Sequence, residues 1–531
     1  RMNSKSLIDH FFTNSDCFNK IEFSHSSFSD HKHIKVSNKQ KYVYHPPKWQ
    51  SYLFSNNEFV DLMKKETLKF LVENADVNSI TKSKEIYLNS PDLIDCEFLY
   101  ENIEHNHSGA MFNLIEHLKR IHDKFYSNLK LKAFQKTKDF EQQINSLYNK
   151  VDLQNCDDAK KEINLLISTQ QDFFKKLVQS SSETYQMRKL ISDGNPNTFT
   201  YQNFKASKQH EHNLLVNNEL INCPNKIAEI FGKVHANLVS PDIMPNSNLN
   251  DLLETFDLKL DEMFPKITSL TSPYSTTSEF KKVIKSMKSN SAPGPSSQPK
   301  QLFSFLIDIL PKFTTNALNN LYNIDLDNSS LSFLKLRNVI FLPKPGLDQT
   351  IAENNRPFAL LEVPYKIVDK ALNKKISPLL HKICHSDQHG FIEKKQMANA
   401  TLSITATMNH IKAHDLECQL IFFDLQKAYD KALNCISNKI LKQIFPCGNF
   451  ADAFISLTNG GKFKVTVKNA SSRIYENKIG LAQGAPSSGS RFNIYNHIFY
   501  CCLTSPKIKA LTLSIAGNTL KPVCFADDGF S

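Results

Sequence analysis

The chain has 531 residues, of which 40% are hydrophobic, and this length suggests about three domains with enough apolar side chains to build cores. A net charge of +11 favours a polyanionic partner, for which nucleic acid is the natural candidate. The 11 cysteines include no Cys-x-x-Cys pair, which argues against a disulfide framework or a zinc knuckle and fits a reducing intracellular compartment. Neither a secretory signal nor an apolar run of roughly 20 residues is apparent, so we expect no membrane anchor.

The N-terminal half is predicted to contain a linker followed by helices. Residues 38–54 are expected to be extended, because the two prolines at 46 and 47 disfavour helix in the residues before them. Residues 117–138 carry seven lysines and arginines with interleaved aromatic residues. Such a basic helix either grips phosphates and stacks on bases or forms a solvated face over an apolar stripe. Apolar residues at helix spacing over 163–178 predict one helix or an antiparallel pair, and residues 179–210 are expected to form a loop.

Helix and strand signals continue in the C-terminal half. Thr276 and Glu279 have the spacing of a capping box, which predicts a helix that ends before residue 291. Residues 337–342 are expected to form a strand, with Lys344 and Arg356 just beyond it. Arginine can clamp phosphate oxygens with two hydrogen bonds and lysine acts as a mobile point charge, so these cations either bind a triphosphate or lie on a surface loop.

Three carboxylates follow apolar runs near the C-terminal end of the sequence. Residues 420–423 are apolar and lead into Asp424, whereas Asp527 and Asp528 follow a second apolar run. Convergent carboxylates suit Mg²⁺, a hard cation that prefers oxygen ligands. The pattern therefore predicts a two-metal site for nucleotidyl transfer, although a solvated turn is the common reading of any single Asp pair.

Several sequence blocks, in this order, resemble the catalytic blocks of reverse transcriptases, and those of the non-LTR (LINE-type) retrotransposon group in particular. These blocks are residues 291–295 (SAPGP), 341–346 (FLPKPG), 355–361 (NRPFALL), 388–392 (QHGFI), 424–430 (DLQKAYD), 480–486 (GLAQGAP) and 525–528 (FADD). The resemblance covers about residues 280 to 531. It implies an α+β fold with the fingers and palm of a right-hand polymerase over 326–531, preceded by an N-terminal extension over 270–325 and a linker and helical region over 38–269.

The resemblance also implies roles for individual residues. Asp424, Asp527 and Asp528 would be the catalytic residues that bind Mg²⁺, with Mn²⁺ as an alternative ion. The deoxynucleotide would be held by Lys344, Arg356, Tyr429, Gln483 and Gly484, with the Tyr429 ring excluding a ribose 2′-OH. We expect Gln483 and Gly484 at the start of a helix, after strands over 462–468 and 473–479. Lys427 and Asp430 are assigned mainly to structure. Departures from the family pattern at 296–297, 485 and 487–488 are expected to alter a turn and to affect fidelity or rate.

Residues 6–12 (SLIDHFF) and 28–34 (FSDHKHI) resemble the last two strands of apurinic-endonuclease-like nucleases. The resemblance implies that residues 1–37 are the C-terminal remnant of an endonuclease/exonuclease/phosphatase-like α/β sandwich. In such an enzyme Asp9 would orient His31 at the scissile phosphate, and Asp30 would support a metal site. The other ligand of that metal is missing, so residues 1–37 are not expected to cleave DNA alone.

Together these features predict an RNA-directed DNA polymerase of a non-LTR retrotransposon, which copies element RNA at nicked target DNA. Its partners would be an RNA template, a DNA primer or target DNA and dNTPs, in a ribonucleoprotein of the nucleus and cytoplasm. No thumb follows the Asp pair, so we expect the chain to be a fragment that is inactive in isolation. The alternatives are a catalytically silent nucleic-acid-binding fragment and a group II intron maturase, which would carry no nuclease remnant.

Overall fold

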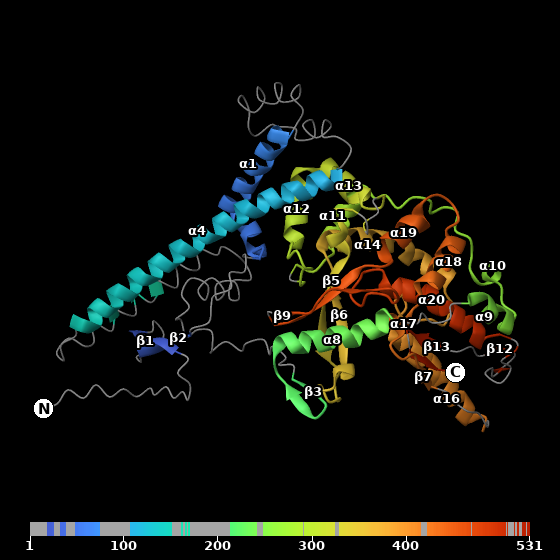
Figure 1. The fold of residues 1–531 in the computed structure, drawn as a ribbon. Coiled ribbons are helices and arrows are strands. Elements are labelled where there is room, and N and C mark those ends of the chain that lie inside the picture. The colour runs from blue at the N-terminus through green and yellow to red at the C-terminus, as the bar shows by residue number, and fades with distance from the viewer. Residues whose placement is uncertain are drawn as a thin grey trace. The chain divides into compact units, whose positions relative to one another are not determined.

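A computed structural model of the chain describes residues 18–25, 32–38, 48–74, 107–150, 213–241, 248–289, 291–323, 329–415, 422–468, 470–505, 523–526 and 528–530, with a few isolated positions. The chain divides into two compact units. Unit 1 comprises Arg1–Ile94 and Phe112–His210, and unit 2 comprises Asp95–Met111 and Glu211–Ser531. Figure 1 shows the described elements of both units.

Unit 1 contains a hairpin and a pair of helices. Strands β1 (Phe18–His25) and β2 (Lys32–Asn38) are antiparallel. The 3₁₀ helix η1 (Ser51–Ser55) precedes α1 (Asn57–Asn74), and most of α4 (His107–Lys150) belongs to this unit. The buried ring of His122 on α4 lies 4.9 Å from that of Trp49, and its Nε2 accepts a hydrogen bond from the Gln50 amide at 2.8 Å.

The expectation of an extended linker through residue 54 is wrong at its C-terminal end. Residues 51–55 form η1, and Trp49, Tyr52 and Leu53 are buried. The proline restriction applies only to the residues that precede a proline, so it says nothing about the chain beyond Pro47. There the aromatic and apolar side chains gain more by packing against α1 and α4 than by remaining in water.

The basic segment 117–138 is helical, as its pattern predicts, because it lies within α4. Tyr126 is buried, whereas Phe134 is exposed and most of the described lysines of this segment are exposed or half-buried. Lys130 lies over the Tyr126 ring, 5.6 Å from its centroid. Both interpretations of the segment, a nucleic-acid surface and a solvated face, stay predictions. None of the helices in the described part of the chain has the length and apolar character needed to cross a bilayer.

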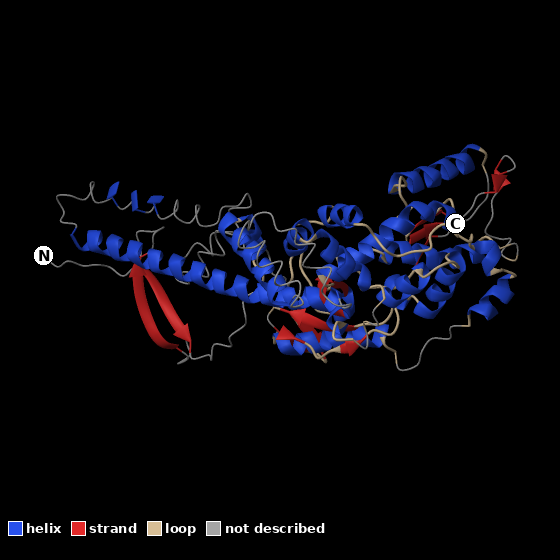
Figure 2. Ribbon diagram, turned by 90° about the horizontal axis from the view of Figure 1, so that it is seen from above, coloured by secondary structure: helices blue, strands red, loops and turns tan. Residues whose placement is uncertain are grey.

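Unit 2 is a mixed α+β structure, which confirms the predicted class, and its strands lie mainly in two sheets (Figure 2). The larger sheet has the order β10-β8-β5-β6, with β9 paired to β8. Strand β5 (Leu336–Pro343) is antiparallel to β6 (Asn355–Leu360) and parallel to β8 (Lys462–Val467). Strands β9 (Ala470–Ser471) and β10 (Tyr475–Glu476) are short.

The predicted strand over 473–479 is therefore too long. The backbone amides of Lys478 and Ile479 donate to the Val239 carbonyl, at 2.8 and 2.9 Å, instead of extending the ladder with β8. The strand ends early because these two amides bond to Val239, a residue more than 200 positions away. A local sequence pattern cannot predict such a long-range contact.

Helix α8 (Pro224–Val239) packs on the five-stranded sheet, beside the short hairpin of β3 (Leu214–Val216) and β4 (Glu219–Ile221). Phe231 of α8 stacks on Phe341 of β5 with ring centroids 4.1 Å apart. Buried residues of α8, β5, β8 and β10 form one hydrophobic cluster. α8 lies upstream of residue 270, where the sequence places the start of the polymerase, yet it shares the core of this sheet.

The smaller sheet has the order β13-β14-β7 and is antiparallel throughout. Its strands are β13 (Val523–Phe525), β14 (Asp528–Phe530) and β7 (Phe422–Asp424). A separate pair joins β11 (Ser514–Ile515) to β12 (Asn518–Thr519). The remaining helices of unit 2 are α9 (Leu249–Phe256), α10 (Leu260–Met263), α11 (Thr277–Lys285), α12 (Lys300–Ile309), α13 (Pro311–Asn320), α14 (Val363–Ile376), α15 (Leu380–Ile383), α16 (Met397–Ala413), α17 (Ala428–Lys431), α18 (Asn434–Ile444), α19 (Phe450–Thr458) and α20 (Ser488–Leu503).

The segment that follows α11 is tied to the junction between β6 and α14. Buried Glu362 accepts hydrogen bonds from the Ser296 amide, at 2.7 Å, and from the Ser296 hydroxyl. A Cβ on Gly294 would lie 2.6 Å from the Glu362 nitrogen, so only glycine permits this approach. Ser296 and Ser297, where the sequence departs from the family pattern, belong to a turn in which the Ser297 amide donates to the Gly294 carbonyl at 2.9 Å.

Thr276 caps α11 as predicted: its Oγ1 accepts from the Glu279 amide, and the Glu279 carboxylate accepts from the Thr276 amide. Thr276→Ala removes this reciprocal pair and should cost about 1 kcal/mol of local stability. We expect the amides of the first turn of α11 to exchange with deuterium about five-fold faster. Ser278→Ala in the same turn is the matched control, and an equal effect of both changes would contradict the capping role.

Candidate active site

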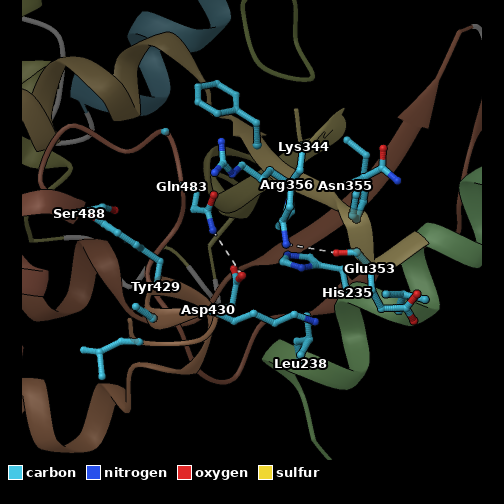
Figure 3. A pocket seen from close by; sticks show the side chains of 18 of the residues that line it. His235, Leu238, Lys344, Glu353, Asn355, Arg356, Tyr429, Asp430, Gln483 and Ser488 are labelled. Atoms are coloured by element: carbon cyan, nitrogen blue, oxygen red, sulfur yellow. Dashed lines mark hydrogen bonds between the residues drawn. The ribbon is translucent and has the colours of Figure 1, made fainter. Parts of the chain in front are cut away.

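A cavity of about 500 Å³ in unit 2 is bounded by α8, β5, β6, the end of β7, α17 and the turn before α20 (Figure 3). Six of the residues that the sequence singled out line it: Lys344, Arg356, Asp424, Tyr429, Gln483 and Gly484. These residues come from segments up to 140 positions apart in the sequence. The fold therefore brings together one predicted catalytic residue and all five predicted nucleotide-binding residues.

Asp424 is the last residue of β7, and its Cα pairs with that of Asp528 across the sheet. Asp424 is exposed and makes no ion pair with any residue that the structure describes. Its oxygens are thus available to a cation, and carboxylates are the donors that Mg²⁺ prefers. Asp527 lies outside the described residues, and within the described part of the chain no group of three metal-binding side chains is present.

The turn that carries the Asp pair is held by Gln388. Ala526 has the left-handed φ of +59°, which is unfavourable for a residue with a Cβ. Its amide donates to Gln388 Oε1 at 2.9 Å, and its carbonyl accepts from Gln388 Nε2 at 3.2 Å. A Cβ on Gly390 would lie 2.4 Å from the Ala526 nitrogen, so the two segments touch through their backbones. Gln388 is the first residue of the block 388–392, but the sequence alone predicts no role for it.

The cation side of the cavity is formed by the β5–β6 connection. The Lys344 ammonium donates to the Glu353 carbonyl at 3.4 Å, and the Lys344 amide donates to the Asn354 carbonyl at 3.0 Å. Arg356 is exposed on β6 and has no ion-pair partner among the described residues. Lys427 also lines the cavity, and its φ of +53° is left-handed. Three cations thus face one cavity, which suits an anionic ligand.

Tyr429 has a fixed ring in this cavity. It stacks on Phe492 of α20 with centroids 4.8 Å apart, and Phe391 approaches it edge-on at 6.5 Å. Aromatic pairs of this geometry hold a ring in one orientation. A rigid ring at the cavity wall can exclude bulky groups sterically.

Gln483 and Gly484 lie in a turn, and α20 begins only at Ser488, so the expected helix start is wrong. Gly484 has φ +119°, which is incompatible with an α-helix, and a Cβ there would lie 2.5 Å from the Ala359 carbonyl. The Ala359 amide donates to the Gln483 carbonyl at 2.7 Å. This close approach joins the turn to β6 and places the Gln483 side chain at the cavity.

The Asp430 carboxylate orients the side-chain amide of Gln483. Gln483 Nε2 donates to Asp430 Oδ2 at 3.3 Å, and Asp430 is buried. Burial raises the pKa of Asp430 to about 6, although Lys427, the hydrogen bond from Gln483 and Lys344 act in the opposite direction. Asp430, for which the sequence predicts mainly a structural role, also lies in the wall of the cavity.

A second buried carboxylate fixes the start of α20. Asp369 of α14 is fully buried and accepts from the Ser487 amide at 2.9 Å and from the Ser487 hydroxyl at 2.6 Å. Burial raises the pKa of Asp369, while these hydrogen bonds and the buried guanidinium groups of Arg491 and Arg337 favour its charged form. No local sequence pattern predicts this contact, because Asp369 and Ser487 lie 118 positions apart.

The predicted nuclease residues Asp9, Asp30 and His31 lie outside the described residues. The same holds for residues 6–12, whereas residues 32–34 of the second predicted strand lie in β2. The roles assigned to these three side chains stay predictions.

Residues 342–530 match the family described as reverse transcriptase (RNA-dependent DNA polymerase). The chain therefore contains a reverse transcriptase domain, and the cavity described above lies largely within it. Over 315 residues, or 57% of its length, the chain is 22% identical to the "Transposon TX1 uncharacterized 149 kDa protein" of Xenopus laevis. The matched segment spans 23% of that relative. These findings confirm the predicted domain and a distant relation to a transposon protein.

Asp430 should make stability depend on pH. Its ordinary pKa is 3.8 and its pKa in the folded chain is about 6, so the folded chain binds this proton more tightly than the unfolded chain. Protonated Asp430 therefore contributes about 3 kcal/mol to the free energy of unfolding. This stabilisation is fully present below about pH 4 and is lost as the pH rises through 6.

Asp430→Asn cannot ionise, so its melting temperature should exceed that of the unchanged chain at pH 8 and approach it at pH 4. Thermal unfolding measured across this range tests the expectation. Asp261→Asn, which changes an exposed carboxylate on α10, controls for the loss of one charge. A difference between the Asp430 variant and the unchanged chain that stays constant with pH would rule out the ionisation argument.

Proposed function

We propose that this chain is part of an RNA-directed DNA polymerase of a non-LTR retrotransposon, which copies element RNA at nicked target DNA. The observation that carries the proposal is the single cavity that unites Lys344, Arg356, Asp424, Tyr429, Gln483 and Gly484. The reverse transcriptase match and the relation to a transposon protein support it. In the predicted right-hand arrangement, β5 and β6 belong to the fingers and β7, β13 and β14 to the palm.

The reaction is the attack of a primer 3′-OH on the α-phosphate of a dNTP, with release of pyrophosphate. Lys344 and Arg356 bind the triphosphate, and Arg356 can form paired hydrogen bonds to its oxygens. Gln483, oriented by Asp430, contacts the nucleotide or its template base, and Gly484 lets the backbone approach it. Asp424, Asp527 and Asp528 would hold Mg²⁺ or Mn²⁺, which when bound supplies charge stabilisation at the reacting phosphate.

The proposed partners are an RNA template, a DNA primer or target DNA and dNTPs, in a ribonucleoprotein of the nucleus and cytoplasm. The net charge of +11 and the basic segment 117–138 within α4 support a nucleic-acid partner. Residues 1–37 are proposed as the nuclease remnant. The relation to a transposon protein favours the retrotransposon over a group II intron maturase.

Polymerase activity is tested by Mg²⁺-dependent incorporation of dNTPs on a primed RNA template, both with the 531-residue chain and with a longer form of the protein. The double change Asp527→Ala, Asp528→Ala should lower the rate by about a hundred-fold or more, because it removes two carboxylates that bind the catalytic cations. Asp261→Ala, Glu262→Ala, an adjacent acidic pair exposed on α10, is the matched control.

The unchanged chain has two informative outcomes in this assay. Incorporation that the Asp527, Asp528 change abolishes supports the polymerase. Binding of the primed template without any incorporation, even in a longer form of the protein, would instead favour a catalytically silent nucleic-acid-binding protein.

Sugar selection is tested at Tyr429. The ring is held between Phe492 and Phe391, so it cannot move aside for a ribose 2′-OH. Tyr429→Ala should lower the preference for dCTP over CTP, which differ only in the 2′-OH, by about ten-fold or more, measured as the ratio of kcat/KM values for incorporation. Tyr495→Ala, a change of a half-buried tyrosine on α20, controls for general loss of structure. An unchanged ratio would remove Tyr429 from sugar selection.

A further inference from the structure

The wall of the cavity opposite the turn before α20 is supplied by α8, which lies outside the matched reverse transcriptase region. Three residues of α8 line the cavity: Val234, His235 and Leu238. His235 is the only one of these three with polar side-chain atoms. Figure 3 shows it in the cavity together with Lys344 and Asp430.

The His235 ring is held in one orientation. Phe463 of β8 approaches it edge-on with centroids 4.8 Å apart, and Phe341 of β5 does so at 6.2 Å. The residue is 7% exposed. A ring packed in this way cannot turn freely to find a partner, so its nitrogens point where the fold sets them.

Neither ring nitrogen of His235 has a hydrogen-bond partner among the described residues. Its Nδ1 is fully buried, whereas its Nε2 is not. A buried polar atom without a partner costs about 1 to 3 kcal/mol. Phenylalanine would fill the same space between Phe341 and Phe463 without that cost, so packing alone does not account for a histidine here. Because Nδ1 is buried, Nε2 is the nitrogen that can donate a hydrogen bond to a ligand in the cavity.

The charges near His235 indicate the kind of ligand. Burial, together with the nearby cations Arg337 and Lys427, lowers the pKa of His235 to about 4, so the ring is neutral at pH 7. A neutral imidazole still offers one N–H donor. Lys344, Arg356 and Lys427 already line the cavity, and another fixed positive charge would repel them. A neutral donor adds a hydrogen bond to a phosphate oxygen without that repulsion.

We propose that His235 contacts the triphosphate of the incoming deoxynucleotide, as a hydrogen-bonding residue that α8 contributes to the same phosphate group as Lys344. This inference rests on the proposed function and adds a substrate-contacting residue to it. Helix α8 would then form part of the substrate site as well as part of the hydrophobic core.

Equilibrium binding of nucleotides to the full chain tests the contact, with Ca²⁺ present so that no turnover is needed. The probes are dTTP and dTMP, which share base, sugar and α-phosphate and differ in the β- and γ-phosphates. His235→Phe keeps an aromatic ring between Phe341 and Phe463 and removes both nitrogens. It should weaken dTTP binding about ten-fold and leave dTMP binding nearly unchanged. Ile230→Met, an apolar change on the same helix at a residue that does not line the cavity, is the matched control and should alter neither affinity.

His235→Gln is the second variant, because its side-chain amide can also donate a hydrogen bond. Recovery of part of the dTTP affinity in this variant supports a hydrogen bond over a packing effect. Equal weakening of dTTP and dTMP, or no weakening in either variant, would overturn the proposed contact while the nucleotide site itself stands. A complete lack of dTTP binding by the unchanged chain would count against the nucleotide site, and so against the proposed function. Circular dichroism and thermal unfolding show whether each variant is folded.

Discussion

The backbone of Ala526 is held in a left-handed conformation by hydrogen bonds with the buried side chain of Gln388. Such a conformation costs roughly 1 to 2 kcal/mol in a residue other than glycine, so it persists only when surrounding contacts determine it. The Asn496 side-chain amide, on α20, donates a third hydrogen bond, to the Ala526 carbonyl at 3.3 Å. The turn sets the register of β13 and β14, and through it Asp528 comes to lie opposite Asp424. The acidic end of the candidate site thus depends on an uncharged amide from another segment.

The cation-lined end depends on a similar contact between distant segments. Gly484 touches the backbone of β6, and Asp369 fixes Ser487 a few residues later. The Ala359 amide also donates to the Gln483 carbonyl, so Gln483 is held in a turn with little freedom. Buried Asp430 then restricts the Gln483 amide. Both ends of the cavity are therefore positioned by buried polar contacts on a well-packed scaffold, an arrangement that favours preorganised binding.

Local patterns in the sequence predict much of this arrangement. The capping box gives the start of α11, the apolar runs give β5, β7 and β13, and the sequence blocks give six residues that meet in one cavity. Contacts between distant segments were not predictable in this way. Strand β10 ends at Glu476, and the amides of Lys478 and Ile479 donate to the Val239 carbonyl instead of extending the ladder. Helix α20 starts late because of the conformation of Gly484. Gln388 and Asp369 act on partners more than a hundred positions away, and periodicity carries no information at that distance.

Helix α8 shows why the limits of a sequence family need not be the limits of a site. Phe341 and Phe463 are buried against α8, and both belong to strands of the sheet that carries Arg356. Without α8 these rings would face water, and their burial typically contributes a few kcal/mol each. The helix also closes one wall of the cavity with Val234, His235 and Leu238. The same segment thus stabilises the sheet and shapes the space beside it. A cavity bounded by residues 342–530 alone would lack a wall, so the functional unit of this chain includes sequence upstream of the reverse transcriptase match.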